Sequence, residues 1–255
     1  MELHSKTEAG TEEALRRNLE ELNSRINAAC QRCNRRPDEI KLVVSTKYVD
    51  YDIIRHLFEL GIRDVGENRV QEAQRKYEAL RDPSGAALPL SWHMFGHLQR
   101  NKVKKALQLF SLLHSVDSPR LAQEVSDTAL AMGKRASVLV EVNVSGEPQK
   151  YGLKEEEVLP FLKELSPMKG LQVLGLMCMT PLTGESEPSR PIYRRLKEII
   201  EEVKQKNIDD IEMRYLSMGM TQDFEVAVEE GSNLLRVGSI LFRDVPRILE
   251  PPTAG

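Results

Sequence analysis

Short apolar segments alternate with helical segments along almost the whole chain of 255 residues. Eight apolar segments with many β-branched residues predict buried strands, at 40–46, 62–66, 92–96, 112–116, 137–144, 171–179, 213–217 and 234–241. Seven segments between them have the apolar spacing of amphipathic helices: 51–60, 70–80, 102–110, 118–132, 154–165, 189–206 and 223–230. The same spacing predicts one more helix over 11–33, before the first strand. One strand and one helix thus recur about every 30 residues, which is typical of parallel strands joined by crossover helices.

A closed barrel and a doubly wound sheet both satisfy this alternation. The length, the strand number of eight and the absence of a Gly-x-Gly-x-x-Gly turn after the first strand favour a single (β/α)8 barrel, or TIM barrel. We therefore expect residues 1–255 to form one domain. Residues 1–36 would be an N-terminal helical extension and 246–255 a flexible tail.

The composition excludes several classes of protein. The chain has 36 basic and 39 acidic side chains and a net charge of -3, which argues against nucleic acid or an anionic membrane as the main partner. It lacks the apolar run of roughly 18 to 20 residues that spans a bilayer and the start of a signal peptide. Three cysteines make no disulfide framework and fit a reducing compartment. We expect a cytoplasmic protein.

In such a barrel the functional residues come from the carboxyl ends of the strands. The first predicted strand ends in Thr46-Lys47. A lysine in partly apolar surroundings there favours the neutral amine that forms a Schiff base with an aldehyde. The alternative is a solvated surface lysine. After the second strand, Asn68 could bind a ligand or serve as a helix N-cap, with Gln71 completing a capping box.

The seventh predicted strand ends in a segment that combines glycine with hydroxyl groups, and the eighth carries a second such segment. These segments are Ser217-Met-Gly-Met-Thr221 and Arg236-Val-Gly-Ser239. Backbone N–H groups and hydroxyls of this kind bind anions, and phosphate sites of barrels favour these two loops. The glycines could equally be ordinary turn residues. Arg236 lies in an apolar strand, so its charge predicts either a place in the barrel mouth or a buried salt bridge.

Two other groups of residues are weaker candidates. Cys30 and Cys33 have the spacing of a zinc or redox pair, but no second pair accompanies them, so we expect no metal site. His93 and His97 lack a third ligand, and a packed or hydrogen-bonded His93 is the simpler interpretation.

Taken together, the motifs of this chain resemble those of one family, the pyridoxal phosphate homeostasis proteins, also called the proline synthase co-transcribed family. The motifs that carry the resemblance are Val44-Ser-Thr-Lys47, Val65-Gly-Glu-Asn-Arg-Val-Gln-Glu72, the run from Trp92 to Lys102, His114-Ser-Val-Asp117, Lys150-Tyr-Gly152, Gly175-Leu-Met177, Leu216-Ser-Met-Gly-Met220 and Arg236-Val-Gly-Ser239. The resemblance implies a barrel like the N-terminal domain of alanine racemase, with pyridoxal 5'-phosphate (PLP, a vitamin B6 form) bound as an internal aldimine.

The resemblance also implies roles for single residues. Lys47 matches the Schiff-base lysine and Arg236 the partner of the pyridine nitrogen. The implied phosphate site is formed by Ser217, Gly238 and Ser239. Asn68 and Met218 match further cofactor contacts, and Lys150 matches a second lysine near the barrel mouth. The chain departs from the family pattern at 241–244, where a glycine usually follows the phenylalanine, and at Thr221, where serine is more common.

An arginine at the pyridine nitrogen disfavours catalysis, because a guanidinium donates hydrogen bonds but cannot accept one, so the nitrogen stays unprotonated. Related racemases add a second domain with an opposite-face base, for which we expect no room after the eighth strand. We therefore predict no catalytic residues and a protein that stores PLP and delivers it to PLP-dependent apoenzymes, as a monomer or weak dimer. The alternatives are a weak PLP-dependent racemase or lyase, a Schiff-base aldolase acting on a phosphosugar, and a structural interaction module.

Overall fold

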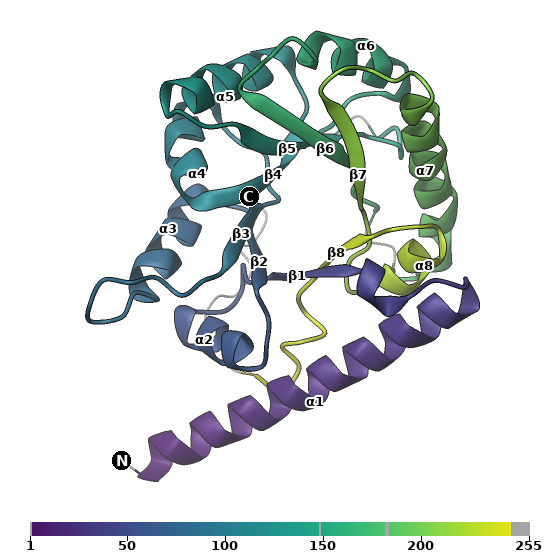
Figure 1. Ribbon diagram of the computed structural model, residues 1–255. Coiled ribbons are helices and arrows are strands. Elements are labelled where there is room, and N and C mark those ends of the chain that lie inside the picture. Colours follow the sequence, from purple (N-terminus) through teal and green to yellow (C-terminus); the bar gives the residue numbers. More distant parts are fainter. Residues whose placement is uncertain (1, 148, 182–183, 246–255) are drawn as a thin grey trace.

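Eight parallel strands form a closed barrel in the computed structural model, which describes residues 2–147, 149–181 and 184–245 (Figure 1). Each strand pairs with the next along the chain, and β1 pairs with β8 to close the ring. The strands are β1 (Lys41–Ser45), β2 (Asp64–Glu67), β3 (Ser91–Met94), β4 (Phe110–Val116), β5 (Ala136–Glu141), β6 (Leu171–Met177), β7 (Ile211–Ser217) and β8 (Leu234–Val237). The predicted (β/α)8 barrel is confirmed. The tail predicted over 246–255 lies outside the described residues.

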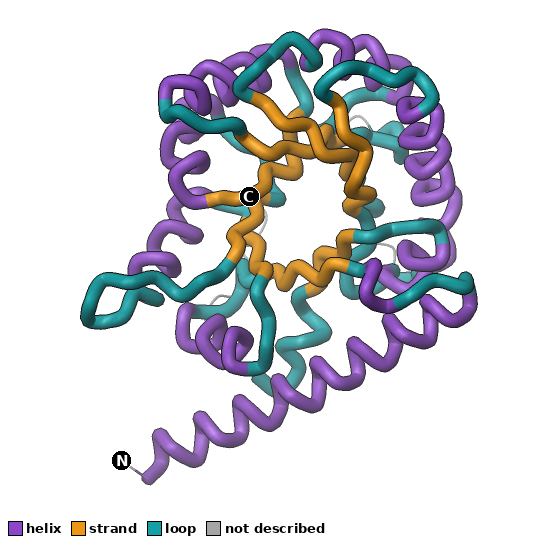
Figure 2. The backbone as a smooth tube through the Cα atoms, viewed as in Figure 1, coloured by secondary structure: helices purple, strands orange, loops and turns teal. Residues whose placement is uncertain are grey.

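Helices surround the barrel as an outer ring, with the strands inside (Figure 2). They are α1 (Glu2–Arg32), α2 (Tyr51–Glu59), α3 (Val70–Ala79), α4 (Val103–Leu109), α5 (Pro119–Ala131), α6 (Glu155–Leu165), α7 (Arg190–Lys204) and α8 (Phe224–Glu229). Short 3-10 helices occupy Pro37–Glu39, Arg100–Lys102 and Glu187–Ser189. The long α1 precedes the barrel and packs against α8 and α2. No helix of the described chain is long and apolar enough to cross a membrane.

The chain buries two apolar layers. One fills the barrel and consists of Val43, Phe95, Leu112, Leu139, Leu174, Met177 and Leu234. The other, much larger layer lies between the barrel and the helices, where each helix contributes its apolar stripe. Strands that are covered on both faces must be apolar almost throughout, which explains the continuous apolar runs of the sequence.

The structure places some element ends differently from the sequence pattern. β8 ends at Val237 rather than at 241, because the next backbone N–H, that of Gly238, donates to the Thr221 hydroxyl and the Leu241 N–H closes a turn onto the Gly238 carbonyl. The N-cap of α3 is Arg69, without a side-chain capping bond, so the expectation of an N-cap at Asn68 is wrong.

The segment after β8 is fastened to α1. The buried Asn18 side chain donates to the backbone carbonyls of Leu241, at 3.0 Å, and Arg243, at 2.8 Å. Arg17 pairs with Asp244 at 3.0 Å, and Arg243 donates to Glu21. Arg243, which stands where the family pattern has a glycine, and its neighbour Asp244 therefore both pair with α1.

Candidate functional site

Lys47 lies two residues beyond the end of β1, at the carboxyl rim of the barrel. Its side chain is half-buried, and Nζ lies 4.7 Å from the centroid of the Tyr48 ring. The aromatic face holds the amine against the rim by a cation–π contact when the amine is charged. The structure thus places Lys47 at a strand end, as the sequence predicted.

A buried ion pair fixes the backbone just before Lys47. The Lys76 ammonium, 1% exposed, donates to Glu67 at 2.6 Å and to the Thr46 carbonyl at 2.8 Å. The Thr46 hydroxyl donates to the same Glu67 carboxylate at 2.7 Å. These bonds join β1, β2 and α3 directly behind the lysine. No local pattern in the sequence predicts this role for Lys76 or Glu67.

The end of β8 lies against the end of β1. A Cβ atom on Gly238 would approach the Ser45 carbonyl oxygen to 2.8 Å, so only glycine allows this backbone contact. Gly238 is buried, Ser239 is exposed, and the Thr221 hydroxyl accepts from the Gly238 N–H at 3.3 Å. The loops after β7 and β8 therefore meet beside the strand that carries Lys47.

Arg236 is a buried cation inside the barrel, only 5% exposed. Its Nη1 donates to the Ser217 hydroxyl oxygen at 2.6 Å and its Nη2 to the Cys178 carbonyl at 2.8 Å. Burial lowers the pKa of the guanidinium, which nevertheless remains charged at all working pH values. Two of its five N–H donors are used by these bonds. No buried salt bridge of the kind considered from the sequence is present at Arg236 within the described chain.

Ser217 connects Arg236 to two histidines in the barrel interior. The fully buried hydroxyl of Ser217 lies 3.0 Å from Nδ1 of His114, and Nε2 of His114 lies 3.0 Å from Nδ1 of His93. His93 is hydrogen-bonded and packed, as the simpler interpretation of the sequence had it. The sequence reasoning assigned no site role to His114. One signal in the sequence could have found it: His114 is a polar residue in a strand whose other residues are mostly apolar, so its side chain is buried and needs hydrogen-bond partners.

The structure does not bring the other predicted contacts together. Asn68 is exposed, whereas Met218 is fully buried in the layer between barrel and helices, and its N–H donates to the Leu234 carbonyl. Lys150 pairs with Glu147 in the loop after β5. Asn68 belongs to a pocket of about 390 Å³ that His97 and Tyr151, stacked at 4.3 Å, also line.

The Glu141 carboxyl group interacts electrostatically with Arg236 and with a second carboxyl group, that of Asp117. Burial, reinforced by the negative charge of Asp117 and opposed by Arg236, raises the pKa of Glu141 to about 7. Burial likewise raises the pKa of Asp117, while His97, 3.6 Å away, acts to lower it. The rim therefore carries acidic as well as basic groups.

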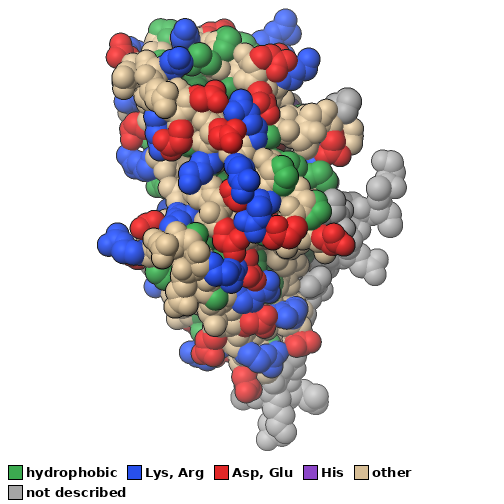
Figure 3. All heavy atoms as spheres, turned by 90° about the vertical axis from the view of Figure 1, so that its right-hand side faces the viewer, with side chains coloured by type: hydrophobic (Ala, Val, Ile, Leu, Met, Phe, Trp, Pro, Cys, Tyr) green, Lys and Arg blue, Asp and Glu red, His purple; other side chains and the backbone are tan. Residues whose placement is uncertain are grey.

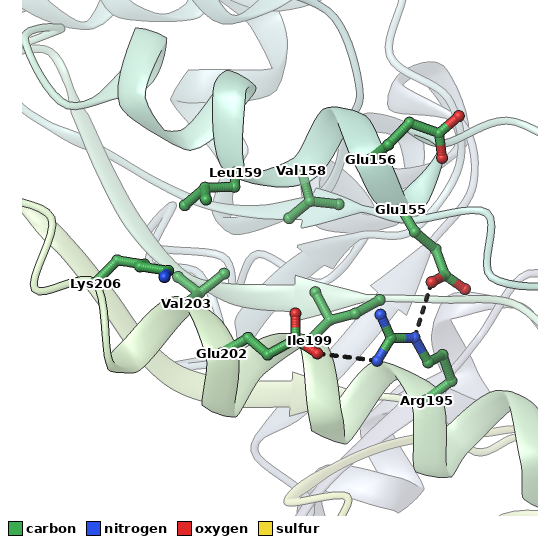
Figure 4. A pocket seen from close by; sticks show the side chains of 9 residues that line it. All are labelled: Glu155, Glu156, Val158, Leu159, Arg195, Ile199, Glu202, Val203 and Lys206. Atoms are coloured by element: carbon green, nitrogen blue, oxygen red, sulfur yellow. Dashed lines mark hydrogen bonds and ion pairs between the residues drawn. The ribbon is translucent and has the colours of Figure 1, made fainter.

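The outer surface has a groove of about 400 Å³ between α6 and α7 (Figure 4). Arg195 bridges the two helices by donating to Glu155 and also bonds Glu202 of its own helix. None of the predicted site residues lines this groove. Within the described part of the chain, no three His, Cys, Asp or Glu side chains are grouped as metal ligands would be, and Cys30 and Cys33 are free thiols on or next to α1.

Comparison with known proteins identifies the family. Residues 12–246 match the model of the alanine racemase N-terminal domain. A pyridoxal phosphate homeostasis protein of Aquifex aeolicus is 40% identical over 88% of this chain and 95% of its own length. A pyridoxal phosphate homeostasis protein of Helicobacter pylori is 35% identical over 80% of this chain and 88% of its own length. The chain belongs to the pyridoxal phosphate homeostasis protein family.

Solved structures agree with this family assignment. PipY of Synechococcus elongatus, in a structure with PLP bound, is 31% identical and superposes with a TM-score of 0.77 over 90% of this chain and 100% of its own. Alanine racemase of Clostridium difficile shares the fold at 16% identity and a TM-score of 0.69, but the match covers only 56% of the racemase chain. This chain thus shares its fold with about half of that racemase chain.

Proposed function

We propose that this protein binds PLP through Lys47 and acts in PLP homeostasis by holding the cofactor and handing it on. The observation that carries the proposal is the presence of a rim lysine after β1 and a buried arginine in the neighbouring strand β8, in a chain that aligns with the whole length of a PLP-bound relative. Delivery to PLP-dependent apoenzymes is the corresponding proposal for its partners.

The residues present fit this cofactor chemically. PLP, when bound, supplies an aldehyde that a lysine amine can capture reversibly and a phosphate that needs hydrogen-bond donors. Lys47 supplies the amine. Gly238, Ser239 and the Thr221 hydroxyl lie on the two loops that carry phosphate sites in barrels. Asn68, Met218 and Ser217 remain proposed contacts.

Arg236 favours a carrier over a catalyst. A guanidinium can only donate, so a pyridine nitrogen beside it stays unprotonated and withdraws electrons weakly. The strong electron withdrawal that PLP enzymes use is then unavailable. A weak racemase or lyase is the rival proposal, because an alanine racemase has a similar fold. The match covers only 56% of that racemase chain, so the rival proposal is limited to weak catalysis.

The test is the visible spectrum of the purified protein after addition of PLP. We expect a band near about 420 nm, typical of a lysine–aldehyde adduct, that disappears on borohydride reduction and leaves the reduced adduct on Lys47 by peptide mass spectrometry. Lys47→Ala should lose the band, whereas Lys206→Ala, on the outer groove, should keep it.

The alternatives predict different results. An unchanged band in Lys47→Ala would refute the assigned anchor. Amino-acid racemisation above background that disappears with Lys47→Ala would favour the enzyme. Colourless protein whose Lys47 reacts instead with a phosphosugar on borohydride treatment would favour the aldolase.

A further inference from the structure

A single line of hydrogen bonds runs through the barrel interior from Arg236 to the amino end of β2. It passes from Arg236 to Ser217, to His114, to His93 and to Asp64, where His93 Nε2 lies 3.0 Å from the Asp64 carboxylate. Lys41, at the start of β1, donates to the same carboxylate at 2.7 Å. The apolar interior layer surrounds this line. The Phe95 ring packs edge-on against the His114 ring, with 5.0 Å between the ring centroids.

The chemistry of the two ends fixes the directions of the two outermost bonds, and the neutrality of the two buried rings fixes the directions of the bonds between them. Arginine can only donate and an ionised carboxylate can only accept. Although partial burial acts to raise the pKa of Asp64, hydrogen bonds from His93 and Lys41 hold it below its ordinary value, so Asp64 is ionised. The Ser217 oxygen accepts a hydrogen bond from Arg236, and the Ser217 hydroxyl donates one to Nδ1 of His114. His114 donates from Nε2 to Nδ1 of His93, and His93 donates from Nε2 to Asp64.

Both rings are neutral in this arrangement, with the proton on Nε2. Their burial agrees with neutrality, because His93 is 3% and His114 0% exposed. Burial lowers the pKa of both, and His93 and Arg236 lower that of His114 further. The opposite direction would require Nδ1–H on His114, a positively charged His93 and a Ser217 proton without an acceptor among the described residues.

We infer that His114 and His93 are positioning residues, which hold the Ser217 hydroxyl and through it the Arg236 guanidinium in the one orientation that suits the cofactor's ring nitrogen. This inference rests on the proposed function. It also redefines the role of Ser217. The hydroxyl proton is committed to His114, so Ser217 can accept a further hydrogen bond but has none to donate to a phosphate oxygen.

The first experiment needs no cofactor. In protein with 15N-labelled histidine, two-bond 1H–15N spectra report the protonation of each ring nitrogen. We expect His93 and His114 to be neutral with the proton on Nε2 across about pH 5 to 8, where an exposed histidine titrates. A charged His93, or a proton on Nδ1 of either ring, would overturn the inference even if PLP binds as proposed.

The second experiment measures PLP affinity from the visible band. His114→Phe keeps a ring but removes both hydrogen bonds, whereas His114→Gln keeps one acceptor and one donor. We expect His114→Phe to lower the PLP affinity about tenfold, as the loss of a buried hydrogen bond predicts. The PLP affinity of His114→Gln should stay within about threefold of that of the wild type. His56→Phe, on α2, is the matched control and should not change the affinity.

Equal affinities for the Phe and Gln variants would overturn the positioning role. If His114→Phe does not fold, Ser217→Ala replaces it, since removal of the hydroxyl should change the protonation of His114 in the same spectra. A wild-type protein without a visible band would refute the proposed function alone, because the spectra of the two histidines would still decide the direction of the bonds.

Discussion

At the scale of single residues, polar groups inside the barrel decide what its rim can do. Lys76 and Glu67 are both 1% exposed and form their ion pair directly behind the turn of Lys47. Placing two charges in an apolar interior costs solvation energy that only complete pairing and hydrogen bonding offset. Glu141 carries no such full compensation, and its pKa is raised instead. The two carboxyl groups therefore respond to mutation in opposite ways.

Lys76→Met should destabilise the protein strongly, because it leaves the Glu67 carboxylate buried without a cation. We expect a loss of about 3–5 kcal/mol in the free energy of unfolding, measured by urea denaturation. The double variant Lys76→Met/Glu67→Gln removes the charge as well and should recover more than half of this loss. Equal losses in the two variants would show that the ion pair does not explain the effect.

Glu141→Gln should stabilise the protein increasingly as pH rises above about 4.5. The folded pKa of about 7 exceeds the ordinary 4.5, so between these values the folded state binds more protons than the unfolded state and stability falls as pH rises. The loss reaches at most about 3 kcal/mol above pH 7. Glutamine stays neutral and avoids it. Unfolding free energies at about pH 4 and about pH 8 check this, and an equal difference at both pH values would contradict it.

At the scale of elements, contacts distant in sequence fix the ends that local pattern leaves open. β8 is a short strand, and the turn that ends it depends on Thr221 from the preceding loop. The segment that follows is fastened to α1 by Asn18. The helix that precedes the barrel in sequence thus supports the chain just after the proposed phosphate loop.

Asn18→Ala should loosen this support. It leaves the carbonyls of Leu241 and Arg243 without their donor, so we expect a loss of about 1–3 kcal/mol in unfolding free energy and faster amide hydrogen exchange over residues 238–245. Asn23→Ala, exposed on the same helix, is the control and should stay within about 0.5 kcal/mol of the wild type. Unchanged exchange in Asn18→Ala would contradict the role of Asn18.

At the scale of the whole molecule, 36 basic and 39 acidic side chains nearly cancel. Figure 3 shows basic and acidic side chains interspersed over the face where α7 and α8 lie. Many belong to ion pairs between helices, such as Arg190 with Glu229 and Arg32 with Glu225. On this face, opposite charges meet in pairs and leave no broad field of one sign, which agrees with the small net charge of -3.

The sequence by itself determined the barrel, since the number, order and approximate bounds of its strands and helices follow from local apolar periodicity. It also placed Lys47 at the end of the first strand, because parallel strands all present their carboxyl ends at one rim. The position of Gly238 and Ser239 just beyond β8, rather than inside a strand over 234–241, came from the structure. The contacts of Ser217 with Arg236 and His114, and the place of Lys76 behind Lys47, follow from the three-dimensional fold alone. Such contacts join residues up to 103 positions apart, as between His114 and Ser217. No local pattern specifies them, because they depend on how closure of the barrel aligns side chains from different strands.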